Sequence, residues 1–302
     1  MSGELPLFVE PMLAELGGEP FDSPEHLFEI KWDGVRALCF VEGGAFRLMG
    51  RSRADYSARF PELEELRALP PGTLLDGELV AWKDGRPDFQ QTMQRIHSRG
   101  THRIRALSRT NPVAFVAFDF LYRDFRPLLG LPLRERRAAL EDLLDGRVGA
   151  RLALSEGLVG SGIAFFEEAR ARALEGVVAK RLASPYRPGA RGDDWIKLKP
   201  RRTVLCAVLG YVAEGNDLRS LVIATEEEGR LVCIGRVASG MTDTVRARLF
   251  SECRSRARST PFLDCAEDAL WIQPGLYCTV SYLERTENGL RAPIFLDSFL
   301  RP

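Results

Sequence analysis

The stretch Lys31-Trp32-Asp33-Gly34-Val35-Arg36 is the most informative part of this chain, because it opens with a residue that the chain otherwise avoids. Only five of the 42 basic residues are lysine. Arginine stays protonated in proteins, whereas the ε-amine of a lysine can lose its proton and act as a nucleophile. The five lysines are Lys31, Lys83, Lys180, Lys197 and Lys199. All except Lys83 lie in apolar, strand-like segments, which indicates that the fold needs amine chemistry.

The pattern around this stretch predicts an α+β domain. Short apolar segments joined by turns alternate with a few helices, which favours α+β over a doubly wound parallel sheet. The predicted strands cover residues 27–31, 35–41, 46–49, 74–82, 113–121, 176–181 and 195–198. The predicted helices cover residues 61–68, 133–144 and 163–174. Asp84-Gly85, directly after a strand, is a hairpin turn signal.

The pattern changes after Pro200. Five further strands are predicted at residues 203–212, 221–225, 231–237, 277–283 and 291–295, and one helix at 243–256. Five strands with a helix after the third is the order of an OB-fold barrel, a common nucleic-acid-binding fold. We therefore expect a first domain over residues 1–200 and an OB-fold over 201–302, with the basic stretch 197–202 as the linker.

Composition excludes several classes of protein. The chain has 302 residues, of which 45% are hydrophobic and 28% charged, as in ordinary globular proteins with room for two cores. No apolar run approaches the roughly 18 residues of a membrane span, and no basic segment leads into an apolar one. The six cysteines form no C-x-x-C pair, which predicts a reduced, cytosolic protein without a structural zinc site.

Charge is uneven although the formal net charge is zero. Residues 89–118 contain no acidic residue, and a second basic cluster has only Glu252 as a counterweight. The first cluster comprises Arg95, His97, Arg99, His102, Arg103, Arg105 and Arg109; the second comprises Arg246, Arg248, Arg254, Arg256 and Arg258. Phosphate contact and a solvated helix face explain each cluster about equally well.

Side-chain alternation gathers the charged residues of the first domain on one side of its strands. The pairs that share a face are Glu29 with Lys31, Asp76 with Glu78, and Lys197 with Lys199. Glu175 and Lys180 fall on opposite faces, so Lys180 is expected to point away from the cleft. A polar cleft over a packed core is the expected result.

Such a cleft holds an amine that can attack, further fixed cations, and carboxylates able to bind a divalent metal. Positive charge near a lysine favours its neutral, nucleophilic form. Fixed cations and Mg²⁺ stabilise the charge that builds on a phosphoryl group during displacement. The pattern therefore predicts nucleotidyl transfer through a lysine–phosphate bond. No G-x-x-x-x-G-K loop is present, so a P-loop enzyme is not expected.

Five motifs, in order, then resemble those of the covalent nucleotidyltransferases, which include ATP-dependent DNA ligases, RNA ligases and mRNA capping enzymes. Lys31-Trp32-Asp33-Gly34-Val35-Arg36 resembles their K-x-D-G-x-R signature. The other four are Leu75-Asp76-Gly77-Glu78, Phe118-Asp119-Phe120-Leu121-Tyr122, Glu175-Gly176-Val177-Val178-Ala179-Lys180 and Trp195-Ile196-Lys197-Leu198-Lys199. The chain is most similar to small bacterial ATP-dependent DNA ligases, which consist of a nucleotidyltransferase (adenylation) domain and an OB-fold.

The resemblance implies a role for each matching residue. Lys31 is expected to form the adenylyl phosphoramidate, Glu29 to recognise adenine, and Phe118 to stack on the base. Glu78 and Glu175 are expected to serve ribose binding and the metal. The remaining nucleotide or phosphate contacts are Arg36, Arg51, Arg191, Lys197 and Lys199, with Arg53 as an alternative to Arg51. Lys180 matches the pattern but is not expected to be catalytic.

The C-terminus departs from the family pattern. Arg291-Ala292-Pro293-Ile294-Phe295 resembles the R-x-P-x-F that introduces the last motif. The family then usually places an arginine and an Asp-Lys pair where this chain has Phe299, Arg301 and Pro302. That element reaches the departing pyrophosphate during self-adenylylation, so its loss predicts a weakened first step unless Arg301 or Arg291 substitutes.

Together these features predict a monomeric ATP-dependent DNA ligase that seals nicks in duplex DNA with Mg²⁺, or with Mn²⁺ in its place. The resemblance further implies a bacterial, cytoplasmic, nucleoid-associated protein that works with other DNA repair proteins. The alternatives are an RNA ligase or capping-type nucleotidyltransferase, and a nucleic-acid-binding protein whose first ligation step has decayed.

Overall fold

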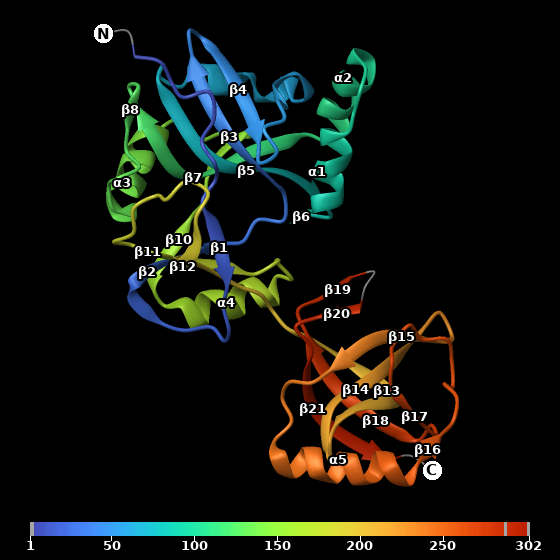
Figure 1. Cartoon of the computed structure of the whole chain (residues 1–302). Coiled ribbons are helices and arrows are strands. Elements are labelled where there is room, and N and C mark those ends of the chain that lie inside the picture. The colour runs from blue at the N-terminus through green and yellow to red at the C-terminus, as the bar shows by residue number, and fades with distance from the viewer. Residues whose placement is uncertain (1–2, 287–288, 301–302) are drawn as a thin grey trace. The chain divides into compact units, whose positions relative to one another are not determined.

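The computed structural model describes residues 3–286 and 289–300, and the chain divides into two compact units, Met1–Lys199 and Pro200–Pro302 (Figure 1). The division falls one residue before the boundary expected from the sequence. Within the described ranges, no helix is both long and apolar enough to cross a membrane.

The larger sheet of the first unit is mainly antiparallel and carries most of the core. Its order is β4 (Ala45–Gly50), β3 (Val35–Glu42), β5 (Thr73–Lys83), β7 (Val113–Arg123) and β8 (Arg126–Pro127), with β6 (Arg86–Pro87) beside β5 and β9 (Leu152–Leu154) beside β7. One face packs against η1 (Ser57–Arg59), η2 (Pro61–Ala68), α1 (Phe89–Ile96) and α3 (Leu133–Leu144), while α2 (Thr101–Thr110) packs on η2. The other face turns toward the second sheet.

The second sheet of this unit has the order β1 (Leu13–Leu16), β12 (Arg191–Leu198), β11 (Val177–Arg181), β2 (Ser23–Ile30) and β10 (Gly157–Gly160). Helix α4 (Gly162–Ala171) covers one face, where Phe28, Val177 and Leu198 are buried (Figure 1). Between the two sheets lies a separate cluster that includes Leu38, Phe118 and Trp195. The opposed inner faces of the sheets therefore enclose the residues of the predicted cleft.

Most predicted elements of the first unit are confirmed, with three corrections. Residues 61–68 form a 3-10 helix interrupted at Leu63 rather than an α-helix. The acid-free basic stretch contains, before the predicted strand 113–121, two helices that were not predicted, α1 and α2. The linker is shorter than predicted, because β12 runs to Leu198 and β13 starts at Arg202. Asp84 and Gly85 make the predicted hairpin turn, both with positive φ.

The second unit is a curled sheet closed by one helix. Its strands are β13 (Arg202–Glu214), β14 (Asp217–Glu227), β15 (Arg230–Val237), β16 (Ala257–Arg258), β17 (Leu270–Ile272), β18 (Leu276–Tyr282) and β21 (Ile294–Leu300), with a separate hairpin of β19 (Glu284–Thr286) and β20 (Gly289–Arg291). Strand β13 pairs with both β14 and β18, and β18 pairs with β21. Helix α5 (Asp243–Ser255) packs on β14. The predicted OB-fold is confirmed.

The prediction for the last strand is wrong at its start. Residues 291–295 do not form one strand, because β20 ends at Arg291 and β21 begins at Ile294. Ala292 between them has φ +48°, a left-handed conformation that interrupts an extended chain.

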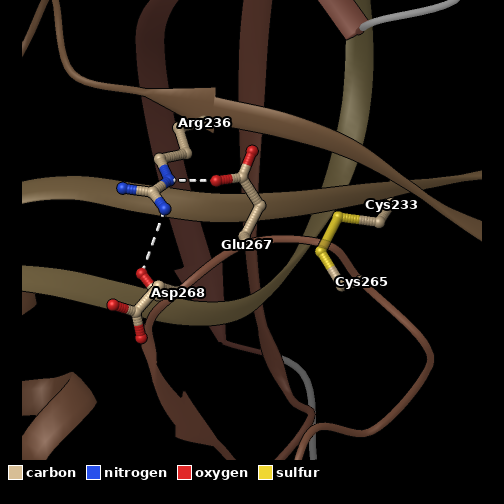
Figure 2. Close-up of a disulfide and its surroundings, with 5 residues drawn as sticks. All are labelled: Cys233, Arg236, Cys265, Glu267 and Asp268. Atoms are coloured by element: carbon tan, nitrogen blue, oxygen red, sulfur yellow. Dashed lines mark hydrogen bonds and ion pairs between the residues drawn. A yellow bond between two sulfur atoms is a disulfide. The ribbon is translucent and has the colours of Figure 1, made fainter.

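The prediction that all six cysteines are reduced is also wrong. A disulfide joins Cys233 of β15 to Cys265 (Figure 2). The other four cysteines are free and buried. Cys265 belongs to residues 259–269, a segment between β16 and β17 that we call the strap. The strap packs Leu263 and Ala269 over a second small cluster on β13 and β14. The two cysteines are 32 residues apart, so their pairing could not be recognised from sequence spacing.

Candidate active site

The register of the smaller sheet decides which side chains enter the space between the sheets. Glu29 and Lys197 both lie opposite Val178, and Trp195 lies opposite Lys180. Directly opposed residues of antiparallel strands point to the same face. These side chains therefore share the inner face, while their neighbours in sequence pack on α4.

Lys31 follows the last residue of β2 and lies beside Glu175. The backbone N–H of Lys31 donates to the carbonyl of Gly176 over 2.9 Å, which joins the two segments. Lys31 Nζ forms an ion pair with Glu175 Oε2, and Lys199 Nζ pairs with Glu175 Oε1 at 2.8 Å. The Lys31 side chain remains 24% exposed. One carboxylate therefore holds the predicted nucleophile beside a second amine, within reach of solvent.

Two motif glycines make these close approaches possible. A Cβ on Gly34 would lie 2.3 Å from the carbonyl oxygen of Leu79 on β5. A Cβ on Gly176, whose φ is +142°, would lie 2.2 Å from the carbonyl oxygen of Leu198. Only glycine tolerates either position. The glycines thus bring the Lys31 segment against β5 and the Glu175 segment against β12.

Arg36 and Asp76 form a two-pronged ion pair at the inner face of the larger sheet. Arg36 Nε and Nη2 lie 2.6 and 2.5 Å from the two Asp76 oxygens, and Tyr186 donates its hydroxyl to Asp76 Oδ2 over 2.6 Å. The Asp76 side chain is fully buried. Both oxygens of Asp76 are therefore engaged by protein donors, as both oxygens of Glu175 are engaged by Lys31 and Lys199.

Glu78 lies opposite Arg36 on the neighbouring strand and is half-buried. Burial raises the pKa of Glu78 to about 8, against the attraction of the Arg36 and Lys31 charges. Burial, and then the Glu175 charge, raise the pKa of Asp33 in the same region. A nearby cation stabilises the ionised form of a carboxylate that is poorly solvated.

Glu29 is more deeply buried than its predicted contact with adenine implies. Its side chain is 2% exposed and forms ion pairs with Lys180 at 2.8 Å and Arg137 at 3.2 Å. Ser155 Oγ donates to Glu29 Oε2 over 3.2 Å. The Glu29 carboxylate is thus surrounded by donors from three other segments.

The expectation that Lys180 points away from the cleft is wrong. Lys180 Nζ contacts Glu29 and lies 4.3 Å from the ring centre of Phe118. The error arose because alternation was counted from Glu175, which lies outside β11; the strand begins at Val177, after the turn at Gly176. Burial lowers the pKa of Lys180, and the Glu29 charge opposes this.

Phe118 is 7% exposed and belongs to the cluster between the sheets. Its ring packs edge-on against Trp195, and the Arg36 guanidinium lies 4.7 Å from its centre. Base stacking by Phe118 stays a prediction.

The structure does not bring the remaining predicted residues into this cluster of contacts. Arg51 is exposed in the turn after β4, and Arg53 in the same turn has φ +62° and pairs with Glu10 at 3.3 Å. Arg191 is exposed, and its guanidinium donates to the carbonyl of Ala14 over 2.5 Å. Their nucleotide contacts stay predictions.

Arg137, Ser155 and Tyr186 were missed by the sequence analysis, although one signal was available. Helix α3 was predicted with correct bounds. Its buried residues Leu133, Arg136, Arg137 and Leu140 follow helical spacing, so two arginines occupy the apolar face. An arginine in such a position requires a buried acceptor. Nothing comparable marks Ser155.

The carboxylates fit a metal that arrives with a nucleotide. Across residues 3–286 and 289–300, no three His, Cys, Asp or Glu residues gather closely enough to hold a metal ion by themselves. Mg²⁺ is commonly bound by one or two protein carboxylates, with water and substrate phosphates completing its shell. Glu78 and Glu175 provide such a partial set.

The two basic clusters differ in how many of their side chains bind other groups of the protein. Arg95 is fully buried, pairs with Glu62 and donates to three backbone carbonyls, so it is structural. The other cations of the first cluster are exposed on and around α2. In the second cluster, Arg246 donates to the carbonyls of Leu218 and Ala238, and Arg256 pairs with Glu252. The helix-face explanation therefore suits the second cluster better.

The two units together have the architecture of a nucleotidyltransferase domain followed by an OB-fold. Residues 11–199 match the family described as ATP dependent DNA ligase domain, and residues 214–301 match the ATP dependent DNA ligase C terminal region. The chain therefore belongs to the ATP-dependent DNA ligase family.

Known relatives agree with this assignment. The ligase domain of LigD from Mycobacterium tuberculosis has a TM-score of 0.60 and 32% identity, over 97% of this chain and 95% of that one. DNA ligase C1 of Mycolicibacterium smegmatis is 32% identical, over 97% of this chain and 89% of that protein. The multifunctional non-homologous end joining protein LigD of Pseudomonas aeruginosa is 33% identical over 95% of this chain, which spans only 34% of that protein.

Proposed function

We propose that this chain seals nicks in duplex DNA with ATP, through an AMP group carried on Lys31. The observation that carries the proposal is the position of Lys31: a partly exposed amine directly after β2, beside Lys199 and Glu175. Membership of the ligase family supports the same chemistry.

The first step forms a bond between Lys31 Nζ and the α-phosphorus of ATP, and pyrophosphate leaves. Lys197 and Lys199 stabilise the charge that builds on the α-phosphate. Lys31 Nζ has to release a proton, through its ion-pair partner Glu175 to solvent, before it attacks, because a protonated amine is not nucleophilic. Glu78 and Glu175 would hold Mg²⁺, or Mn²⁺ in its place, which would supply positive charge to the phosphates. Glu29, Phe118 and Arg191 contact the nucleoside.

The later steps move AMP to the 5′-phosphate of the nick, and the 3′-hydroxyl then displaces it. Arg36 and Arg51 contact the ribose or this 5′-phosphate. The exposed cations of α2 hold the duplex through its phosphates, without reading sequence. The chain acts as a monomer in the bacterial cytoplasm and serves DNA repair with other proteins. The similarity to the Pseudomonas non-homologous end joining protein supports the repair role.

A weakened first step is the second candidate, and one observation favours it. Phe299, at the position where the family usually has an arginine, stacks on Tyr277 with ring centres 5.8 Å apart. An aromatic ring cannot donate hydrogen bonds to pyrophosphate. Arg301 and Pro302 lie outside the described residues. In this version the chain binds DNA and seals pre-adenylylated nicks, but loads AMP slowly.

The test is to incubate the purified protein with Mg²⁺ and ATP, or GTP, and then weigh it and map any adduct. AMP on Lys31 supports the proposal, and GMP would indicate a capping-type enzyme. Lys31→Arg should abolish the adduct although it keeps the charge, whereas Lys83→Arg, at the end of β5, should retain it. No adduct, with pre-adenylylated nicks still sealed, supports the weakened first step. Loss of both activities contradicts the ligase proposal.

A further inference from the structure

The Glu29 carboxylate is held by two residues that lie outside all five motifs, Arg137 on α3 and Ser155 after β9. Arg137 Nη1 lies 3.2 Å from Glu29 Oε1 and also donates to the carbonyl of Ser155 over 2.6 Å. Ser155 Oγ donates to Glu29 Oε2 over 3.2 Å and accepts from Trp32 Nε1 over 3.0 Å. Ser155 therefore connects Glu29 to the residue next to Lys31.

These contacts compensate the charge of the carboxylate and fix its orientation. A buried carboxylate is stable only when cations and hydrogen-bond donors compensate its lost hydration. Lys180 and Arg137 supply the cations, and Ser155 supplies a hydroxyl. An ionised carboxylate only accepts hydrogen bonds, at about four positions, of which three are occupied here.

We propose that Arg137 and Ser155 are positioning residues that set nucleobase selectivity. They hold the Glu29 carboxylate in one orientation, so that its remaining acceptor position takes a hydrogen bond from an exocyclic amine at position 6 of a purine. A 6-oxo purine presents an oxygen there, and two acceptors facing each other in a buried site are unfavourable. This inference rests on the proposed contact between Glu29 and the base.

The experiment compares ATP with GTP in each variant. Rates of lysyl-nucleotide formation are measured by mass, and affinities for the two nucleotides by calorimetry, which needs no adduct. Ser155→Ala and Arg137→Met should each lower the ATP-over-GTP preference about tenfold, equivalent to one lost hydrogen bond to a charged group. Arg137→Lys and Ser155→Thr should restore most of it. Arg134→Met, an exposed arginine on the same helix, is the matched control and should change nothing.

Glu29→Gln separates this inference from the function on which it rests. If Glu29→Gln lowers the preference but Ser155→Ala and Arg137→Met do not, the positioning role is refuted while the contact with the base survives. If Glu29→Gln has no effect, both the base contact and the positioning role are refuted. Labelling of Lys31 would still support the ligase proposal. Should Arg137→Met fail to fold, the milder Ser155→Ala decides.

Discussion

The two units bury opposite kinds of side chain. The first unit buries charged residues, among them Glu29, Asp76, Asp119, Arg136 and Lys180. The described residues of the second unit bury no charged side chain; their buried polar residues are Ser220, Thr225 and Ser281. Burying a charge is costly unless it is paired, so an apolar core alone would stabilise the first unit at least as well. Some of the buried charges of the first unit therefore mark the predicted site.

Not every buried charge belongs to the predicted site. Glu29–Lys180 and Arg36–Asp76 line the space between the sheets, whereas Arg136 clamps Asp119 with two contacts of 2.8 Å. Arg136 also donates to the carbonyls of Leu131 and Ser184. The second unit uses other means: the Cys233–Cys265 disulfide and the Arg236–Glu267 ion pair fasten its strap (Figure 2).

The largest effect on stability is expected from breaking the Arg136–Asp119 pair. Arg136→Met leaves a fully buried carboxylate without its partner, which should cost about 3–5 kcal/mol of the free energy of unfolding. Arg285→Met, in the half-exposed Arg285–Glu227 pair of the second unit, should cost less than about 1 kcal/mol. Chemical denaturation of both variants measures the difference. Equal losses would show that burial does not distinguish the two units.

Reduction of the disulfide should have the second-largest effect on stability, and this effect should be confined to the second unit. Cross-linking across 32 residues is expected to contribute about 3–4 kcal/mol by restricting the unfolded chain. With a dithiol reductant, hydrogen exchange followed by mass spectrometry should show faster exchange in the strap and in β13–β15. Exchange in the first unit should not change.

The double variant Cys233→Ser, Cys265→Ser is the control for this experiment, because the same reductant should have no further effect on it. Alkylation should modify Cys233 and Cys265 only after reduction. If both cysteines react in protein that was never reduced, the disulfide is absent and the strap is held by packing and Arg236 alone.

Sequence patterns could predict most of the fold because they depend on local periodicity. Strands β3, β5, β7 and β11 and helix α3 were found within a few residues, and Gly34 and Gly176 have the close contacts that explain their motifs. The failures at the site and in the strap depend on contacts or turns that periodicity does not record. The Glu29–Arg137 contact joins residues 108 apart in sequence. The face of Lys180 depends on a turn at Gly176, and the disulfide depends on how the strap lies over the barrel. None of these features produces a periodic pattern in the sequence.

The smallest expected effect is on the salt dependence of DNA binding. It distinguishes exposed arginines from arginines that are hydrogen-bonded within the protein. Arg103 and Arg105 on α2 are exposed, whereas Arg246 on α5 donates to backbone carbonyls of its own unit. If the α2 arginines each contact one phosphate, replacing both with glutamine should make the slope of log affinity against log salt shallower by about 2. Arg246→Gln should leave that slope unchanged and lower the stability of the second unit. Fluorescence anisotropy with a nicked duplex at several salt concentrations measures the slopes. An unchanged slope in the α2 variant would remove α2 from the DNA-binding surface, because a contact with phosphate cannot be lost without changing how many counterions are released.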